Sequence, residues 1–144
     1  MPDDAQPATP AGDGPPGTDA GYSARLTIPA ATRFLRLARL TAAGLAGDLG
    51  FRVDAVEDLR VAVDELSALA IEGANAGAHL DLVYREHGTS LVIDGSCPTE
   101  DSAPPELHRV ARELLEIVAD EYSFEVVDHC RRFRLLKHAD STSV

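Results

Sequence analysis

Apolar and polar residues follow regular patterns after residue 21, and these patterns predict five strands and three helices. Residues 22–29 alternate between apolar and polar side chains, which is typical of a half-buried strand that ends at Pro29. Residues 32–49 and 54–72 place apolar side chains three and four positions apart, as two amphipathic helices do. The folded part of the chain is therefore expected to begin with a strand and two helices.

The ends of both predicted helices carry recognisable signals. Thr32 is expected to cap the first helix, which Gly50 ends. Asp54 opens the second helix with Glu57 three residues later, an arrangement that predicts a capping box. This second helix is expected to fail near Gly73.

After residue 73, the sequence pattern predicts a hairpin, a loop, a third helix and two further strands. Gly88 marks the turn of the hairpin, and a proline at position 105 suits the first turn of a helix. The expected elements are strands at 80–84 and 91–93, a loop at 95–105, a helix at 105–118, and strands at 124–126 and 133–135. This order predicts an α+β fold: a two-layer α/β sandwich with a mixed, mostly antiparallel sheet of about five strands and three helices on one face.

Composition divides the chain into a tail and one domain. Residues 1–21 contain five of the nine prolines and four aspartates, and no Leu, Ile, Val or Phe. Such a segment cannot bury enough apolar surface to offset the entropy of ordering it. We expect a disordered tail at 1–21, a single domain at 22–138 and a frayed end at 139–144.

The net charge of −11 argues against direct binding to DNA, because a protein that neutralises phosphates needs a concentrated basic face. The chain has no run of about 18 apolar residues that could span a membrane. Its start lacks the basic and apolar regions of a signal peptide. The two cysteines form no disulfide framework, and the five histidines show no metal-ligand spacing. These features predict a cytoplasmic protein without a metal site.

The charge is unevenly distributed. Residues 25–52 hold five arginines and one aspartate, whereas residues 53–130 hold 18 acidic and four basic side chains. A basic segment beside an acidic one suggests electrostatic matching to a charged partner protein. The alternative is that both segments form ordinary solvated surfaces.

The second predicted helix contains the most informative stretch of the chain, DLRVAVDE at residues 58–65. It follows a helix with FLRLAR at residues 34–39 and precedes the predicted hairpin. Here the chain resembles the anti-sigma-factor serine kinases of the GHKL (histidine-kinase-like) ATPase superfamily, which are bacterial switch proteins. The resemblance covers residues 22–138 and is closest from Thr27 to Glu72. It implies a GHKL ATPase-like fold and a role in regulating transcription by partner switching.

The resemblance also implies that the nucleotide site is degenerate. Glu65 matches the family's general base, but Leu69 replaces the asparagine that coordinates Mg²⁺ four residues later. The first glycine box matches residues 94–98, DGSCP, where Asp94 keeps a vestigial adenine position and the glycines are displaced or lost. The second box reads Pro-Pro-Glu at 104–106, which lacks two amide protons and brings a carboxylate near the phosphates. We therefore expect no cofactor, with ATP and Mg²⁺ bound only if kinase activity is kept. Without the resemblance, Asp94 is interpreted as a turn residue at a strand end.

The leading hypothesis is an anti-sigma-factor-type regulator, a pseudokinase that sequesters a sigma factor and is released by an anti-anti-sigma antagonist. As the resemblance implies, the first helix contacts the sigma factor, which makes Arg33, Arg36 and Arg39 candidate partner-binding residues. Family members also often form homodimers. One alternative is an active ATP-dependent serine/threonine kinase that phosphorylates an anti-anti-sigma factor and uses Glu65 as its base. Another is a non-catalytic scaffold that pairs with a second GHKL protein.

Overall fold

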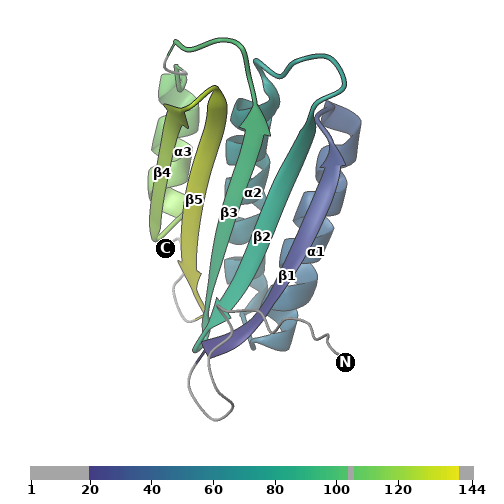
Figure 1. Ribbon diagram of the computed structural model, residues 1–144. Helices are drawn as coiled ribbons and strands as arrows, with labels where there is room; N and C mark the ends of the chain where they lie inside the picture. Colours follow the sequence, from purple (N-terminus) through teal and green to yellow (C-terminus); the bar gives the residue numbers. More distant parts are fainter. Residues whose placement is uncertain (1–19, 104–105, 140–144) are drawn as a thin grey trace, which may run out of the picture.

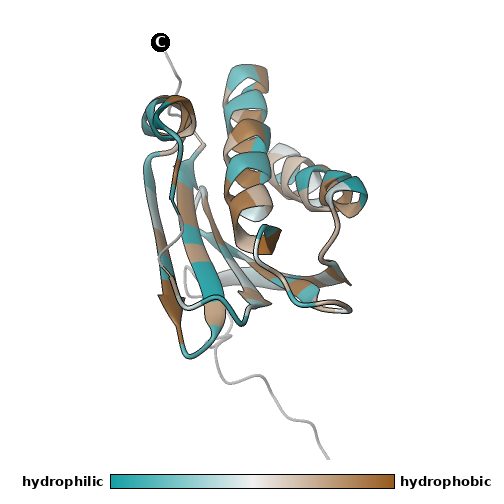
Figure 2. Cartoon of the chain, turned by 90° about the horizontal axis from the view of Figure 1, so that it is seen from above, coloured by the Kyte–Doolittle hydropathy of each residue, from teal (hydrophilic) through white to brown (hydrophobic). Residues whose placement is uncertain are grey.

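The computed structural model describes residues 20–103 and 106–139, which form one sheet covered by helices (Figure 1). The strands are β1 (Ala20–Pro29), β2 (His79–His87), β3 (Ser90–Pro98), β4 (Glu121–Val127) and β5 (Cys130–His138). The helices are a 3₁₀ turn η2 (Thr32–Phe34), α1 (Leu35–Asp48), α2 (Val53–Ile71) and α3 (Arg109–Val118). Figure 2 shows all three α-helices on the same side of the sheet. The predicted α+β sandwich with three helices on one face is confirmed.

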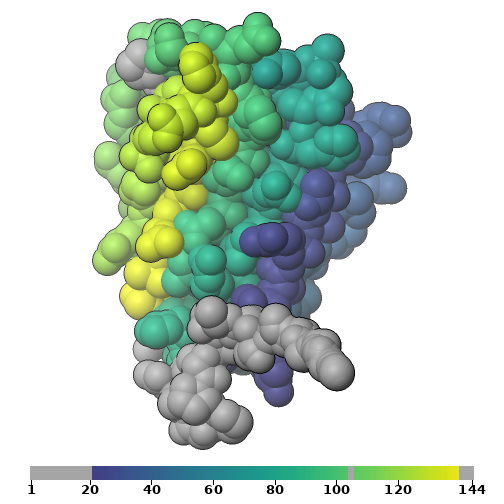
Figure 3. All heavy atoms as spheres, viewed as in Figure 1, coloured from purple at the N-terminus to yellow at the C-terminus, as the bar shows by residue number. Residues whose placement is uncertain are grey.

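The strand order is β1-β2-β3-β5-β4. Two helices separate β1 from β2, and β5 inserts between β3 and β4 after the α3 crossover. Every neighbouring pair of strands among the described residues is antiparallel. The sheet is thus wholly antiparallel there, whereas a mixed, mostly antiparallel sheet was expected. The other face of the sheet, which we call the helix-free face, is left without covering helices (Figure 3).

The core lies between the helices and the sheet, with α2 at its centre. Leu59 and Leu66 of α2 are completely buried, and α2 packs against strands β2, β3 and β5. α1 packs against α2 and buries small side chains, among them Ala38 and Ala42. The Tyr84 hydroxyl donates a 3.0 Å hydrogen bond to the Ala38 carbonyl, and burial raises the pKa of this tyrosine above its usual range. These contacts fix the helix layer over the centre of the sheet.

A buried lysine joins α2, α3 and β5. Lys137 of β5 is 1% exposed, and its Nζ donates a 2.8 Å hydrogen bond to the Val118 carbonyl at the C-terminal end of α3. The same Nζ lies 3.6 Å from Asp58 Oδ2 on α2. Because the last carbonyls of a helix have no partner within it and carry partial negative charge, the ammonium group caps α3.

The two predicted helix caps are wrong. Thr32 begins the 3₁₀ turn, and neither this turn nor α1 has a side-chain hydrogen bond at its N-terminus. α2 begins at Val53, one residue earlier than expected, so Asp54 lies inside its first turn. Its Oδ1 accepts a 2.9 Å hydrogen bond from the N–H of Ala55 rather than from that of Glu57, and no capping box forms.

Strand β3 is longer than its predicted counterpart, and the loop expected from Gly95 begins only after Pro98. Gly95 is buried between Ile93 and Cys97 on the side that faces the helices. A Cβ atom at this position would lie 2.2 Å from an atom of the Phe133 ring on β5. The glycine therefore serves close packing of an aromatic ring within the sheet and not a turn.

Three predictions fall largely outside the described residues. Of the expected tail at 1–21, only Ala20 and Gly21 are described, and they belong to β1. Of the expected frayed end at 139–144, only Ala139 is described, and its N–H donates a 3.1 Å hydrogen bond to the Thr89 carbonyl. Positions 104 and 105 of the second predicted glycine box also lie outside the described residues.

Candidate functional site

The position expected to hold a magnesium ligand lies beside an apolar cavity. Leu69, in the last turns of α2, borders a cavity of about 360 Å³. Leu107 before α3 and the β4 residues Tyr122, Phe124 and Val126 form other parts of its wall, which Ser102 and Glu125 complete. Glu65 lies one turn earlier on the same helix and is partly exposed, but it is not among the described lining. Glu65 and Leu69 are four residues apart on α2, and of the two Leu69 borders this cavity.

The side chain of Arg131 from β5 packs against the C-terminal end of α2. The Arg131 side chain is 5% exposed, and its Nη1 donates a 2.7 Å hydrogen bond to the Leu69 carbonyl. The guanidinium also lies 3.5 Å from Glu72 and 3.9 Å from Asp101. A Cβ atom on Gly73 would approach this guanidinium to 3.1 Å, so the space is closely packed. A fixed positive charge at this helix end complements the helix dipole.

The residues that line this cavity supply few of the groups that bind Mg²⁺ and ATP. Leu69 has no oxygen to offer a metal, and Mg²⁺ requires oxygen ligands. Among the described residues that line the cavity, Glu125 is the only charged one, and its carboxylate would repel phosphate. The nearby Arg131 already donates to a backbone carbonyl. The lining of this cavity is thus mainly apolar, whereas a nucleoside triphosphate is bound by cations and amide donors.

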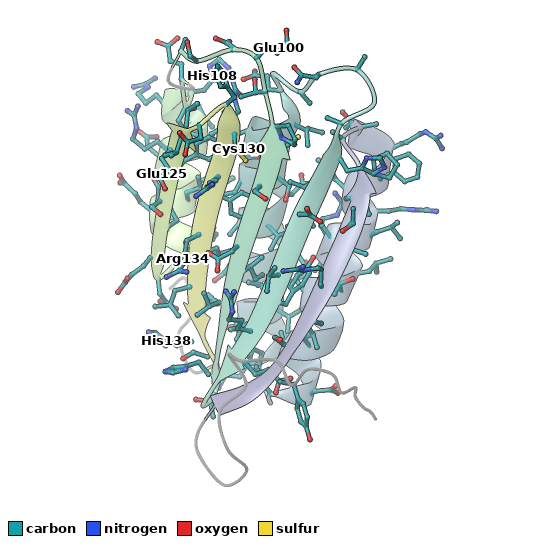
Figure 4. All side chains as sticks on the ribbon, in the orientation of Figure 1. Glu100, His108, Glu125, Cys130, Arg134 and His138 are labelled. Carbon is teal, nitrogen blue, oxygen red and sulfur yellow. The ribbon has the colours of Figure 1, made fainter. Side chains whose placement is uncertain are left out.

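The interpretation of Asp94 as a turn residue at a strand end is wrong. Asp94 lies within β3 and points to the helix-free face, away from α2. Its carboxylate accepts hydrogen bonds from Arg85 of β2 at 2.5 Å and from Arg134 of β5 at 2.7 Å. The hydrogen bond to Asp94 raises the pKa of the Arg134 guanidinium. Asp94 therefore belongs to an ion network on the helix-free face, where Figure 4 also shows Arg134.

The helix-free face carries a balanced set of charges. A hollow of about 590 Å³ on this face is lined by three arginines and three acidic residues: Arg25, Arg132, Arg134, Asp81, Asp94 and Glu125. A phosphate or other small anion is bound where cations are in excess. This hollow therefore has no preference for an anionic ligand.

The three candidate arginines of the first helix occupy different environments. Arg33 and Arg36 are exposed, and the Arg33 guanidinium lies 4.4 Å from the centre of the Phe34 ring. Arg39 instead forms a 2.5 Å ion pair with Asp64 of α2. Exposed apolar residues accompany the first two arginines at helical spacing, namely Leu37 at 37% and Leu40 at 56% exposure. We call Arg33 of η2 together with Arg36, Leu37 and Leu40 of α1 the α1 surface.

Sequence reasoning missed Arg131, although a signal for it exists. In β5 the residues Arg131, Phe133, Leu135 and Lys137 alternate with more exposed ones and are all buried. Strict alternation places these four residues on one face of the strand. The sequence could therefore have predicted that Arg131 and Lys137 are buried and bind acidic or carbonyl groups. Only the packing of β5 under α2 and α3 shows which groups they meet.

No helix among the described residues is long and apolar enough to cross a membrane. Within residues 20–103 and 106–139, no group of three or more His, Cys, Asp or Glu side chains could hold a metal ion.

Comparison with known proteins reveals similarity to bacterial protein kinases. The chain is 29% identical over 98 residues to the serine-protein kinase RsbW of Halalkalibacterium halodurans, a match that covers 53% of this chain and 60% of the relative. It is 31% identical over 75 residues to RsbW of Oceanobacillus iheyensis, which covers 48% of each chain. The chain is thus similar, over about half its length, to two proteins named as serine-protein kinases. No family model matches it. The matches span about half the length of these relatives, so relationship alone does not transfer their activity to this chain.

Proposed function

We propose that this protein is an anti-sigma-factor-type regulator that sequesters a sigma factor and no longer transfers phosphate. Its similarity to the RsbW kinases supports the partner-switching role. The observation that carries the proposal is the apolar cavity beside Leu69, which is unsuited to Mg²⁺–ATP. A protein that keeps this fold without a working nucleotide site retains its surfaces, and binding is the function that remains.

The α1 surface is the proposed contact with the sigma factor. Exposed Leu37 and Leu40 supply apolar area, while Arg33 and Arg36 supply guanidinium groups that pair well with carboxylates. This combination suits a partner segment that has both acidic and apolar side chains. Arg39 is proposed to contribute less, because binding would have to compete with its ion pair to Asp64.

The resemblance to the switch kinases also supports proposals about release of the sigma factor and about dimerisation. An anti-anti-sigma antagonist is proposed to reverse the capture of the sigma factor. A homodimer is proposed to form through β1 and α1, where the exposed Tyr22 provides apolar area at the sheet edge. We place this activity in the cytoplasm, where sigma factors meet RNA polymerase.

Direct binding measurements test the proposed partner. Each sigma factor of the source bacterium is purified and titrated with the full chain, with Arg36→Glu and Arg132→Glu as variants. Both arginines are exposed, but Arg132 lies on the helix-free face, so it is the matched control for the change in charge. We expect one sigma factor to bind, and Arg36→Glu to weaken binding by about tenfold or more while Arg132→Glu has little effect. If no sigma factor binds, or if both variants weaken binding equally, the proposal is wrong.

An active kinase is the second candidate, because both relatives are named as serine-protein kinases. It would use Glu65 as the general base, which is partly accessible on α2. Phosphate transfer from ATP to an anti-anti-sigma protein that disappears in Glu65→Ala would establish this alternative. The absence of transfer, together with retained capture of the sigma factor, is the result expected for the pseudokinase.

A further inference from the structure

We propose that strand β4 is a docking edge for an extended segment of a partner protein in which apolar and basic side chains alternate. The segment would pair with the backbone of β4 and extend the sheet by one strand. This surface lies at the opposite end of the sheet from β1 and does not rest on the proposed capture of a sigma factor by α1.

The first observation is that β4 is a sheet edge. In the order β1-β2-β3-β5-β4, it pairs with β5 and has no second strand partner among the described residues. One row of its backbone N–H and C=O groups is thus available to another chain. Partners that add a strand to such an edge obtain affinity from the backbone and specificity from alternate side chains.

The second observation is that the inner side of β4 is incompletely covered. Tyr122, Phe124 and Val126 face the helix layer but are only partly buried, in contrast to the fully buried residues of β2 and β3. α3 packs mainly against α2 and leaves the cavity of about 360 Å³ between Leu69 and these three side chains. Apolar side chains at alternate positions of an added strand would extend this half-filled apolar layer.

The third observation is the charge on the outer side of β4. Glu121 and Glu125 alternate with the inner residues and are exposed. Glu125 borders both the apolar cavity and the hollow of the helix-free face, and Figure 4 places it at the rim of the sheet. Carboxylates beside an edge attract lysine or arginine on a neighbouring strand and repel acidic side chains. The occupant is therefore a basic, apolar segment and not an acidic one.

A labelled model peptide tests the proposal on the full chain. The probe is an eight-residue peptide of alternating valine and lysine, and its control is the same peptide with glutamate in place of lysine. We expect the lysine peptide to bind in fluorescence anisotropy and the glutamate peptide not to bind. Glu125→Arg should weaken binding of the lysine peptide by about two- to fivefold, within the range set by exposed charge pairs. Asp48→Arg makes the same charge change at the exposed end of α1 and should leave binding unchanged.

Nuclear magnetic resonance of the chain shows where the lysine peptide binds. The amide signals of residues 121–127 should shift on addition of the lysine peptide. Equal weakening by both variants, shifts confined to other strands, or no binding at millimolar peptide would overturn the proposal. Self-association that sedimentation detects and that Glu125→Arg abolishes would also overturn it, in favour of a second copy of this chain at the edge.

Discussion

Replacement of Arg131 by methionine tests whether the chain's own guanidinium stabilises the end of α2. Methionine keeps an unbranched, apolar side chain of similar reach but cannot donate a hydrogen bond. The substitution removes the 2.7 Å hydrogen bond to the Leu69 carbonyl and the contacts with Glu72 and Asp101.

The expected loss is dominated by the buried hydrogen bond. A hydrogen bond from a charged group contributes about 1.5–3 kcal/mol, and without it the Leu69 carbonyl keeps only the 3.4 Å hydrogen bond that the N–H of Glu72 donates. Glu72 and Asp101 are 62% and 56% exposed, so solvent screens their attraction and they add little. The stabilisation by Arg131 is partly offset because its guanidinium is desolvated and its Nε has no partner among the described residues. We therefore expect Arg131→Met to lower the free energy of unfolding by about 2 kcal/mol.

Urea unfolding followed by far-ultraviolet circular dichroism measures this change, with Arg132→Met as the matched control. Arg132 is the next residue along the strand and points to the opposite, exposed face, so its loss should cost about 0.5 kcal/mol or less. If Arg131→Met is no more destabilising than Arg132→Met, the reasoning about a closed helix end is refuted.

Three further changes probe other parts of the fold. Gly95→Ala should destabilise the protein by about 2–3 kcal/mol, because the added Cβ would lie 2.2 Å from a Phe133 ring atom; thermal unfolding checks this. Lys137→Met should cost about 3 kcal/mol in urea unfolding, because it removes the cap of α3 and leaves Asp58 buried without its cation. The free energy of unfolding should fall as the pH rises from about 9 to about 11. In the folded state burial raises the pKa of Cys97 to about 11, so the unfolded thiol ionises while the folded one keeps its proton.

Matched variants control each of these three predictions. Gly47→Ala adds a methyl group in open space on α1 and should not destabilise, so an equal loss at both glycines would contradict the packing argument. Asp58→Asn introduced into the Lys137→Met background should restore part of the stability, and a further loss would argue against the unpaired carboxylate. Cys97→Ala should reduce the alkaline decline, and an unchanged decline would assign it to other groups.

The architecture could be predicted from the sequence because it depends on local periodicity. Alternation at 22–29 and helical spacing at 54–72 each identify an element that buries one face, and the structure contains both. The helix caps at Thr32 and Asp54 could not be predicted reliably, because a shift of one residue moves a side chain away from the free N–H groups.

The surroundings of the candidate site depend on which strands are neighbours, and local patterns do not show this. Asp94 meets Arg85 and Arg134 because β3 lies between β2 and β5, which the order of elements along the chain does not reveal. Likewise, Leu69 alone predicts a missing oxygen ligand. Only the packing of β5 against α2, with β4 across the cavity from Leu69, shows the apolar cavity and the Arg131 guanidinium at that helix end.

Calorimetric titration of the full chain with Mg²⁺–ATP tests the central claim, that the fold is kept while the nucleotide site is lost. We predict no saturable heat, which corresponds to a Kd weaker than about 1 mM. Saturable binding with a Kd of about 10 μM or tighter would contradict the account.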